Sequence, residues 1–393
     1  MKLITRNGVK RIIILVFLLA VFYCLFVRCC SVIEVPPYVV SKHSRTDFQP
    51  AKSGNGELLF DNGIPVLVLR GSPQDMGAQQ GVLLKPQLGR IVDTYLSRFL
   101  SKENNNQVAL KALEEMKPFM PDAYVAELES MAVAAGVLPD KLKLLHTIID
   151  IPRMPFCSAI IAGPPSIKEP EIIFGRNLDF FSLGIADKYT LITVYHPADK
   201  KSFASVTWPG FAGVLTGVNE DGLVLAMLVS LDNAASANGI PSVMLLREVL
   251  ENAADMDSAV QLIRNAKRSA PVNLAIADAG GNSAVIEFTQ NQVAVRRPEK
   301  GLLYCTNWFV SGEMRVSKGD DRYETMRNLA EQAYGNIGVA ETMNILKAVP
   351  MSMINLQSMV ILPKGKILYL AAGSIPATKC EYVKIDIGKY ITK

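Results

Sequence analysis

Histidine and cysteine are scarce in this sequence, and neither is spaced as a metal site or a disulfide framework requires. The histidines are three in number: His43, His146 and His196. The six cysteines form an N-terminal group and a group in the body of the chain: Cys24, Cys29, Cys30, Cys157, Cys305 and Cys380. Zinc modules and disulfide-stapled domains need closely and regularly spaced ligands or half-cystines. We therefore expect no metal, and no sequence motif indicates a cofactor.

The chain also lacks a strong excess of one charge. It has 41 Lys and Arg against 37 Asp and Glu, a formal net charge of +4, and no long basic run beyond the extreme N-terminus. Proteins that bind nucleic acid usually carry a basic stripe, so we expect no nucleic-acid partner. With 49% hydrophobic and 20% charged residues among 393, the composition is that of a globular protein of one large or two modest domains.

A long apolar run covers residues 12–27, between a basic N-terminus and Arg28. Basic residues before such a run stay in the cytoplasm, so residues 1–30 are expected to be a cytoplasmic flank and a transmembrane signal anchor. The rest of the chain would then be extracytoplasmic, in a periplasm, at a cell surface or in a lumen. No small-residue cleavage site follows directly, which favours an uncleaved anchor; the alternative, a cleaved signal peptide, would give a secreted protein.

The next part of the chain divides into a tether and an α-rich segment. Residues 31–56 are rich in proline, glycine and polar residues without a sustained period, which is typical of a tether. Residues 57–156 begin with two apolar runs around a turn at 61–63, which predicts a hairpin. Ser72 followed by proline then predicts a helix start. Further helices are expected at about 107–117, 121–135 and 139–149.

Residues 157–393 contain most of the strand patterns. Short apolar runs separated by turn residues predict strands, with helical patterns between the strand groups and near the C-terminus. Strands gather in runs and so do helices, which favours an α+β fold with mainly antiparallel sheets over a doubly wound one. The sequence gives no indication of oligomeric state.

Cys157 stands at the head of a predicted strand, and the next strand runs into Gly175-Arg176-Asn177-Leu178-Asp179. If the two strands form a hairpin, Arg176 and Asp179 come within reach of the thiol. A cation there favours thiolate, and a carboxylate can orient an amine. Taken alone, a cysteine on a strand is more often a small buried core residue, and an Arg-x-x-Asp pair is more often a surface ion pair.

Five ordered motifs together resemble the N-terminal-nucleophile (Ntn) hydrolase superfamily. The resemblance is to the acyl-CoA:6-aminopenicillanic acid acyltransferase family (peptidase C45-like), related to choloylglycine hydrolase and acid ceramidase, and covers roughly residues 57–330. The motifs are Leu69-Arg70-Gly71 through Gly81, Cys157-Ser158, Gly175 through Asp179, Gly217-Val218-Asn219-Glu220-Asp221-Gly222-Leu223, and Ala277-Asp278 through Glu287 to Thr306-Asn307-Trp308-Phe309. Several motifs in order are far more specific than any one of them.

The resemblance implies a four-layer αββα sandwich preceded by the α-rich pro-segment, with Cys157 as nucleophile. It places Arg176 and Asp179 beside that nucleophile, and gives Asn219 and Asn307 roles in oxyanion stabilisation and nucleophile positioning. Arg322 matches a later family arginine loosely. Two residues depart from the acyltransferase pattern: Trp308 replaces the usual histidine and Ser158 the usual threonine.

The resemblance also implies self-cleavage between Phe156 and Cys157. The freed α-amine, with a pKa near 7.7–8.0 in model compounds, can take the thiol proton at neutral pH, which suits a chain with few histidines. The predicted function is that of an autoprocessed cysteine amidase or acyltransferase. Its substrate would be a linear amide, an N-acyl small molecule or a peptide-like conjugate, reacting through an acyl-Cys157 intermediate.

Two other functions fit the sequence. The first is an exported binding protein that keeps the fold and is never cleaved or catalytic. The second is an uncut cysteine protease in which His146, eleven residues before Cys157, acts as the base.

Overall fold

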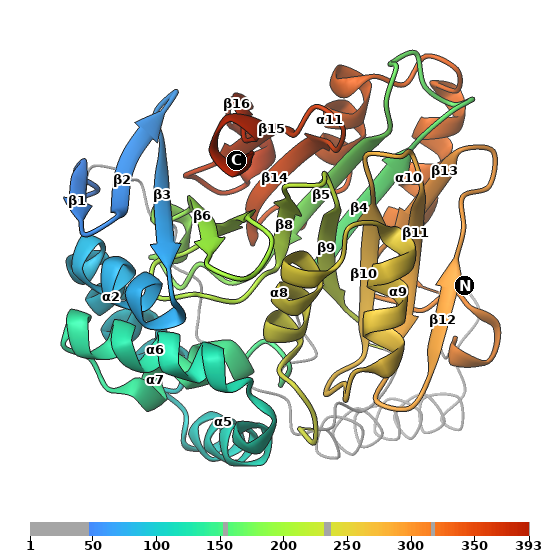
Figure 1. Cartoon of the computed structure of the whole chain (residues 1–393). Helices are drawn as coiled ribbons and strands as arrows, with labels where there is room; N and C mark the ends of the chain where they lie inside the picture. The colour runs from blue at the N-terminus through green and yellow to red at the C-terminus, as the bar shows by residue number, and fades with distance from the viewer. Residues whose placement is uncertain (1–46, 152–155, 232–236, 316–318, 393) are drawn as a thin grey trace, which may run out of the picture.

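The computed structural model describes residues 47–151, 156–231, 237–315 and 319–392 (Figure 1). The expected anchor over residues 1–30 and the first part of the tether lie outside the described residues. Among the helices that are described, none combines the length and the apolar character needed to cross a membrane.

Two β-sheets form the centre of the molecule. Sheet A has ten strands, in the order β1 (Ala51–Ser53), β2 (Gly56–Asp61), β3 (Ile64–Gly71), β6 (Leu191–Pro197), β7 (Phe203–Thr207), β8 (Thr216–Asn219), β9 (Val224–Val229), β10 (Val272–Ala277), β11 (Ser283–Phe288) and β12 (Val293–Arg296). Sheet B has six, in the order β13 (Leu302–Cys305), β4 (Phe156–Ala162), β5 (Ile173–Asp179), β14 (Asn355–Leu362), β15 (Ile367–Ala372) and β16 (Val383–Asp386). Of these pairings, only that of β3 with β6 is parallel. The expected α+β class with mainly antiparallel sheets is therefore confirmed.

Helices cover the outer face of each sheet. Helices α8 (Ser242–Asn252) and α9 (Met256–Asn265) pack on sheet A, and α10 (Asp321–Gln332) and α11 (Val339–Ala348) pack on sheet B. The two sheets meet where β4 contacts β9 and β10. Strands such as β9 and β10 are buried along their whole length, because one face meets helices and the other meets the second sheet. The order of layers is the one expected of an αββα sandwich.

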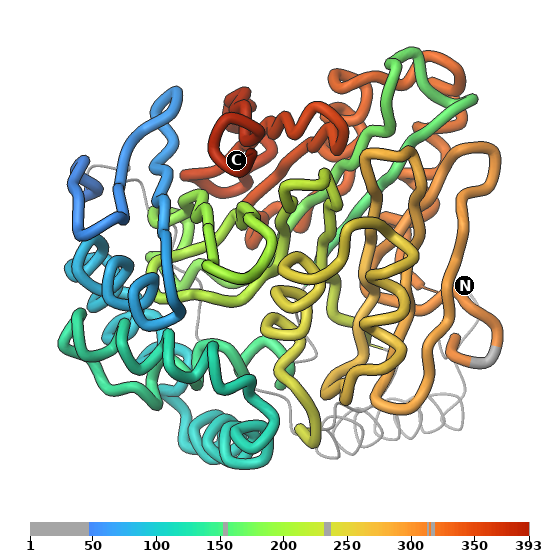
Figure 2. Tube along the Cα trace, viewed as in Figure 1, coloured from blue at the N-terminus to red at the C-terminus, as the bar shows by residue number. Residues whose placement is uncertain are grey.

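The segment before residue 156 adds both strands and helices. Its first strands extend sheet A beyond β6, and its helices form a block at one side of the molecule, blue to teal in Figure 2. The helices are α2 (Pro73–Leu83), α3 (Lys85–Arg90), η1 (Ile91–Leu96), α4 (Ser97–Phe99), α5 (Glu103–Met116), α6 (Asp122–Ala135) and α7 (Pro139–Thr147). Helix α2 begins where predicted, with a capping box between Ser72 and Asp75. It lies so close to α6 that a Cβ on Gly77 would be 2.1 Å from the carbonyl oxygen of Glu127.

The boundary expected at Glu57 needs correction, because the fold begins earlier. Strand β1 lies within the expected tether and pairs with β2. Phe48 is buried, and its ring meets that of Tyr189 edge-on at 5.9 Å. The described fold therefore already includes Phe48, since a buried aromatic ring belongs to the core.

A buried ionic cluster, here called the Arg247 cluster, joins the two parts of the chain. Arg247 on α8 pairs with Glu127 on α6 at 2.7 Å and with Glu251 at 2.8 Å. Its guanidinium lies over the rings of Tyr124 and Tyr195, 4.4 and 4.7 Å from their centroids. Burial raises the pKa of Glu127, and the positive charge of Arg247 opposes that shift. Because Tyr124 and Glu127 precede residue 156 and the other three follow it, the cluster links the segment before Cys157 to the region after it.

Candidate active site

Cys157 occupies the second position of β4, and the expected hairpin with β5 is present. The antiparallel register pairs Phe156 with Asp179, Cys157 with Leu178 and Ala159 with Arg176. Side chains alternate along a strand, so Cys157 and Arg176 lie on the same face as diagonal neighbours. The hairpin thus brings the predicted arginine to the thiol.

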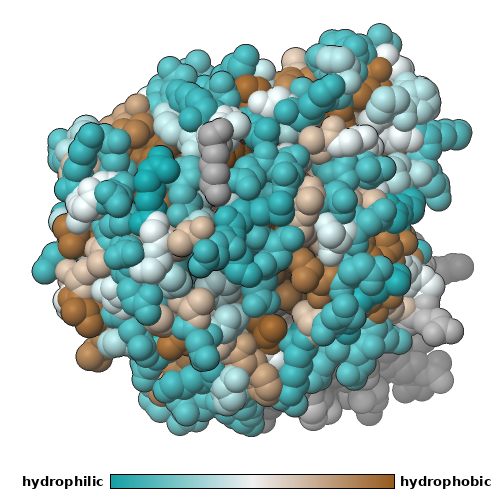
Figure 3. All heavy atoms as spheres, viewed as in Figure 1, coloured by the Kyte–Doolittle hydropathy of each residue, from teal (hydrophilic) through white to brown (hydrophobic). Residues whose placement is uncertain are grey.

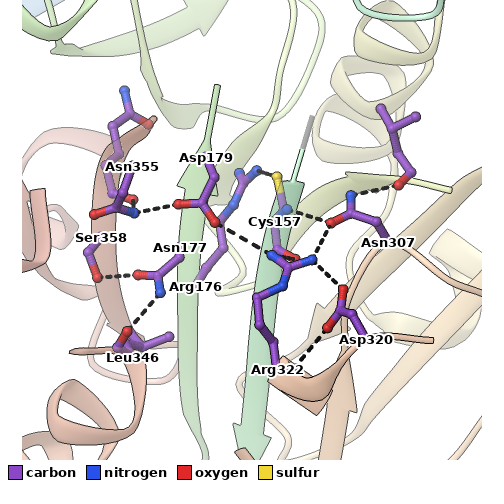
Figure 4. A network of polar contacts seen from close by, with 12 residues as sticks. Cys157, Arg176, Asn177, Asp179, Asn307, Asp320, Arg322, Leu346, Asn355 and Ser358 are labelled. Carbon is purple, nitrogen blue, oxygen red and sulfur yellow. Dashed lines mark hydrogen bonds and ion pairs between the residues drawn. The ribbon is translucent and has the colours of Figure 1, made fainter. Parts of the chain in front are cut away.

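Arg176 lies beside the thiol (Figure 4) and also bonds to residues of the sheet A side. Its Nη2 donates to Cys157 Sγ at 3.3 Å and to the carbonyl oxygen of Met227 at 2.9 Å. Its Nη1 donates to the carbonyl oxygen of Leu215 at 3.0 Å and also contacts the hydroxyl of Thr216. Only 1% of Arg176 is exposed. The arginine thus places a fixed cation directly beside the buried sulfur of Cys157.

Asn307 and Arg322 hold the backbone of Cys157 from the other side. The Cys157 N–H donates to Asn307 Oδ1 at 2.6 Å, and Asn307 Nδ2 donates to the carbonyl oxygen of Val229 at 2.7 Å. Arg322 Nη1 donates to the Cys157 carbonyl oxygen at 3.1 Å, and its Nη2 donates to Asn307 Oδ1 at 3.0 Å. Arg322, which matches the family arginine only loosely, is therefore part of this cluster. The cluster also holds the backbone nitrogen of Cys157, which the proposed cut would turn into the new N-terminus.

Asp179 lies at the end of β5, opposite Phe156. It is fully buried, accepts a hydrogen bond from Asn355 Nδ2 at 2.7 Å and lies 3.6 Å from Arg322 Nη1. Burial raises its pKa to about 7, although the bond from Asn355 and the charge of Arg322 act in the opposite direction. Its carboxyl group therefore changes protonation state near neutral pH, beside the bond expected to be cut.

Two members of the cluster were not predicted. Asn355 binds Asp179, and Asp320 forms an ion pair with Arg322 at 2.6 Å. Asp320 caps helix α10, because its side chain accepts the N–H of Arg322 at 3.0 Å. An acidic residue just before a predicted helix is a recognised cap signal and could have indicated Asp320. Asn355 is the first residue of β14 and carries no such signal.

Asn219 does not join this cluster, which corrects the expectation drawn from the resemblance. Its Nδ2 donates to the carbonyl oxygens of Leu250 at 3.0 Å and Ala253 at 2.7 Å. Its Oδ1 accepts the N–H groups of Asp221 at 3.2 Å and Leu223 at 3.0 Å. Both amide hydrogens are already used, so the side chain has no donor left for an oxyanion. Asn219 instead fixes the turn after β8 to the end of α8.

His146 makes its contacts with Leu142, Ala212 and Phe211, and these contacts give no support to the protease hypothesis that requires it. Its Nδ1 is 2.7 Å from the carbonyl oxygen of Leu142, and its Nε2 accepts the N–H of Ala212 at 2.8 Å. The ring stacks on Phe211 with centroids 4.8 Å apart. Burial lowers the pKa of His146 to about 4, so the ring is neutral at neutral pH. The two hydrogen bonds occupy both of its nitrogens. His146 shapes the loop around Phe211.

An apolar cavity of about 70 Å³ lies beside Cys157 and Arg176. Its walls come from both parts of the chain. The residues before position 156 are Ile91, Tyr95, Leu145, Ile148 and Ile149; those after it include Leu178, Phe180, Trp208, Phe211, Met227, Val229 and Leu356. The face of the molecule shown in Figure 3 is different in character, since it is mostly hydrophilic. An apolar group placed next to the thiol would thus be enclosed rather than exposed to water.

A cysteine at the head of a strand, with a cation at its sulfur and an amide oxygen at its nitrogen, is the arrangement that the resemblance to Ntn hydrolases implies. Within the described part of the chain, no three His, Cys, Asp or Glu residues are grouped so as to hold a metal ion. Residues 167–357 match the family model described as acyl-coenzyme A:6-aminopenicillanic acid acyl-transferase. The match covers just under half of the chain and confirms the resemblance to that family. Cys157 itself precedes the matched region.

Curated relatives and solved structures are similar at low identity. The protein dcd1A of Dictyostelium discoideum is 25% identical over 268 residues, which is 60% of this chain and 60% of that protein. An uncharacterised protein of Archaeoglobus fulgidus is 22% identical over 349 residues, 74% of this chain and 57% of that protein. The chain thus spans less than two thirds of the length of both relatives.

Among solved structures, a Caenorhabditis elegans ortholog of N-acylethanolamine-hydrolyzing acid amidase has 21% identity and a TM-score of 0.46. The match covers 53% of this chain and 93% of that one. Penicillin V acylase from Agrobacterium tumefaciens has 16% identity and a TM-score of 0.42, covering 60% of this chain and 88% of that one.

Proposed function

We propose that this protein is an autoprocessed cysteine amidase or N-acyltransferase that uses Cys157 as its N-terminal nucleophile. The observation that carries the proposal is the pair of contacts at Cys157: Arg176 at its sulfur and Asn307 at its backbone nitrogen. The first prepares a nucleophile, and the second holds the atom that would become the base. An ordinary core cysteine needs neither contact.

The first reaction is the cut. Cys157 Sγ attacks the carbonyl carbon of Phe156, the C–N bond between the two residues breaks, and the nitrogen takes the thiol proton. Water then adds to the resulting thioester, which releases the Phe156 carboxylate and restores the thiol. The product is a small chain that ends at Phe156 and a larger one that begins with a free amine on Cys157.

Turnover then follows on the larger chain. The α-amine of Cys157 accepts the thiol proton, and the sulfur attacks the carbonyl of a substrate amide. The leaving amine takes the proton, and the acyl group stays on the sulfur as a thioester. Water or a second amine removes the acyl group, giving hydrolysis or transfer. Arg176 and Asn307 fix the sulfur and the nitrogen during these steps.

The acyl part of the substrate is proposed to be apolar. The cavity next to Cys157 is lined almost wholly by aliphatic and aromatic side chains, and its polar groups are those around the thiol. Such a site rewards burial of hydrocarbon, at roughly 0.8 kcal/mol for each CH2 group. A cavity of about 70 Å³ admits a short acyl group as it stands and must widen for a long one.

Self-cleavage is tested by denaturing electrophoresis and N-terminal sequencing of the purified protein beside Cys157→Ala. The 42.9 kDa wild-type chain is expected to give fragments of about 17 and about 26 kDa, in proportion to the residues on each side of the cut, and the larger should begin at Cys157. The variant lacks the attacking sulfur and should stay intact. Cys305→Ala, which changes another buried cysteine, should be cut normally. An intact wild-type chain would reject the proposed cut.

The substrate class is tested on the processed protein with a panel of N-acyl amines that share one amine and differ in acyl group. Release of the amine is expected to be faster for apolar acyl groups than for charged ones, because a charge entering the cavity loses its hydration. If no amide in the panel reacts and Cys157 forms no acyl adduct, the non-catalytic binding protein becomes the better description.

Residues 12–27 are proposed to anchor the protein in a membrane with the catalytic region outside the cytoplasm. The basis is the sequence alone, a long apolar run behind a basic flank. The full chain is expected in the membrane fraction, and a variant lacking residues 12–27 in the soluble fraction. Recovery of both in the soluble fraction, with the first still carrying its original N-terminus, would contradict the anchor.

A further inference from the structure

Glu287, in strand β11 of sheet A, holds the loop that follows β13 of sheet B. Its Oε1 accepts the N–H of Val310 at 2.9 Å, and its Oε2 accepts the N–H of Ser311 at 2.8 Å. Arg296 on β12 donates from Nε to Oε1 at 2.6 Å and from Nη2 to the carbonyl oxygen of Tyr304 at 3.0 Å. Glu287 is fully buried. A carboxylate so placed is stabilised by charge-assisted bonds, and each bond is directional.

The loop held in this way carries Asn307. Its start is fixed by Asn273, whose Nδ2 donates to the carbonyl oxygen of Thr306 at 3.2 Å. The carbonyl oxygen of Asn307 accepts the N–H of Leu231 at 2.8 Å. Glu287 fixes the far end, three and four residues beyond Asn307. The position of the Asn307 side chain therefore depends on anchors at both ends of a short segment.

We propose that Glu287 is a positioning residue for the nucleophile, acting through Asn307, and this inference rests on the proposed function. Asn307 Oδ1 accepts from the Cys157 nitrogen at 2.6 Å, so it sets the direction in which that nitrogen points. After the cut the same nitrogen is the base, and its lone pair must face the thiol. Catalytic groups displaced by about 1 Å can lose on the order of a hundredfold in rate, so a loop anchor has a measurable effect.

The test measures acylation of Cys157 by p-nitrophenyl butanoate in the whole processed protein. The burst of nitrophenolate gives the acylation rate separately from the dissociation constant of the ester. Glu287→Gln keeps one acceptor oxygen, so an N–H of the loop loses its partner. Ser311→Pro removes the second N–H at a residue whose φ of −70° suits proline. Circular dichroism and melting curves establish which variants fold, and either folded variant suffices.

Both variants are expected to acylate about tenfold more slowly, with the dissociation constant changed by less than about twofold. The dissociation constant should change little because Asn307 is not one of the residues that line the cavity. The matched control is Arg297→Gln, since Arg297 is the sequence neighbour of Arg296 but pairs with Asp257 instead. If a variant is purified uncut, the rate at which it cuts itself is measured instead and compared with the rates of wild type and of Arg297→Gln.

A double variant separates positioning from a general loss of structure. Glu287→Gln combined with Asn307→Ala should be no slower than Asn307→Ala alone, because the effect of Glu287 passes through Asn307. Losses that multiply would overturn the inference, and so would wild-type rates in both Glu287→Gln and Ser311→Pro. A wild-type protein without any burst would instead overturn the proposed function, and the inference with it.

Discussion

Replacing Arg247 with leucine is expected to lower the free energy of unfolding by about 3 to 5 kcal/mol, among the largest losses of any single change in this protein. The substitution removes the cation between Glu127 and Glu251 and leaves two carboxyl groups buried without their partner. It also removes the Arg247 Nη1 donor from the carbonyl oxygen of Ala212. Urea unfolding at pH 7, followed by circular dichroism, measures the loss.

The control for this change is Arg264→Leu, which alters an exposed arginine on the neighbouring helix α9 and should cost less than about 0.5 kcal/mol. In the processed protein the Arg247 variant should also release the small chain at lower urea, because the cluster joins the two parts. An Arg247→Leu protein as stable as the control would mean that the buried pairs contribute no net stability.

Replacing Asp179 with asparagine is expected to stabilise the fold at pH 8 while it impairs the cut. Burial raises the pKa of Asp179 in the folded protein to about 7, from a model value of 3.8. Between these values the folded state binds more protons than the unfolded state, so this group makes stability fall as pH rises from about 4 to about 7. Asparagine does not ionise, and its Oδ1 can still accept the hydrogen bond from Asn355.

The measurement is the difference in unfolding free energy between Asp179→Asn and wild type at a series of pH values. It should be small at pH 3 and reach roughly 2 to 4 kcal/mol in favour of the variant at pH 8. The rate of the cut should fall by at least about tenfold, since the carboxyl beside Phe156 can no longer take or give a proton. Asp199→Asn, at an exposed position, is the control. A difference that does not change with pH would contradict the assignment.

The hairpin around Cys157 could be predicted because its signals are local. The strand patterns and the turn residues between them are read from a few neighbouring positions, and the hairpin then dictates that Arg176 reaches the thiol. The start of α2 at Ser72 was predicted for the same reason. The sequence does not reveal β1 before Glu57, because a three-residue strand has too few residues to show a period.

The two asparagines show what the sequence does not determine. Asn219 and Asn307 both lie in turn-like motifs at the ends of strands. The side chain of Asn219 nevertheless bonds to backbone groups at the end of a helix, whereas that of Asn307 bonds to Cys157, 150 residues away in the chain. Arg322 likewise meets the Cys157 carbonyl oxygen over a separation of 165 residues. Such contacts depend on how two sheets and a helix are packed together, and spacing along the chain does not report that packing.

The parallel pairing of β3 with β6 has a consequence for the durability of the processed protein. If the chain is cut as proposed, the small chain would supply the strands beyond β6, and its departure would expose the backbone N–H and C=O groups of β6 that pair with β3 as an open sheet edge. Open edges of this kind pair with other chains and promote aggregation. The small chain would therefore cover an edge of the large one, and conditions that remove it should end in precipitation rather than in a soluble large chain.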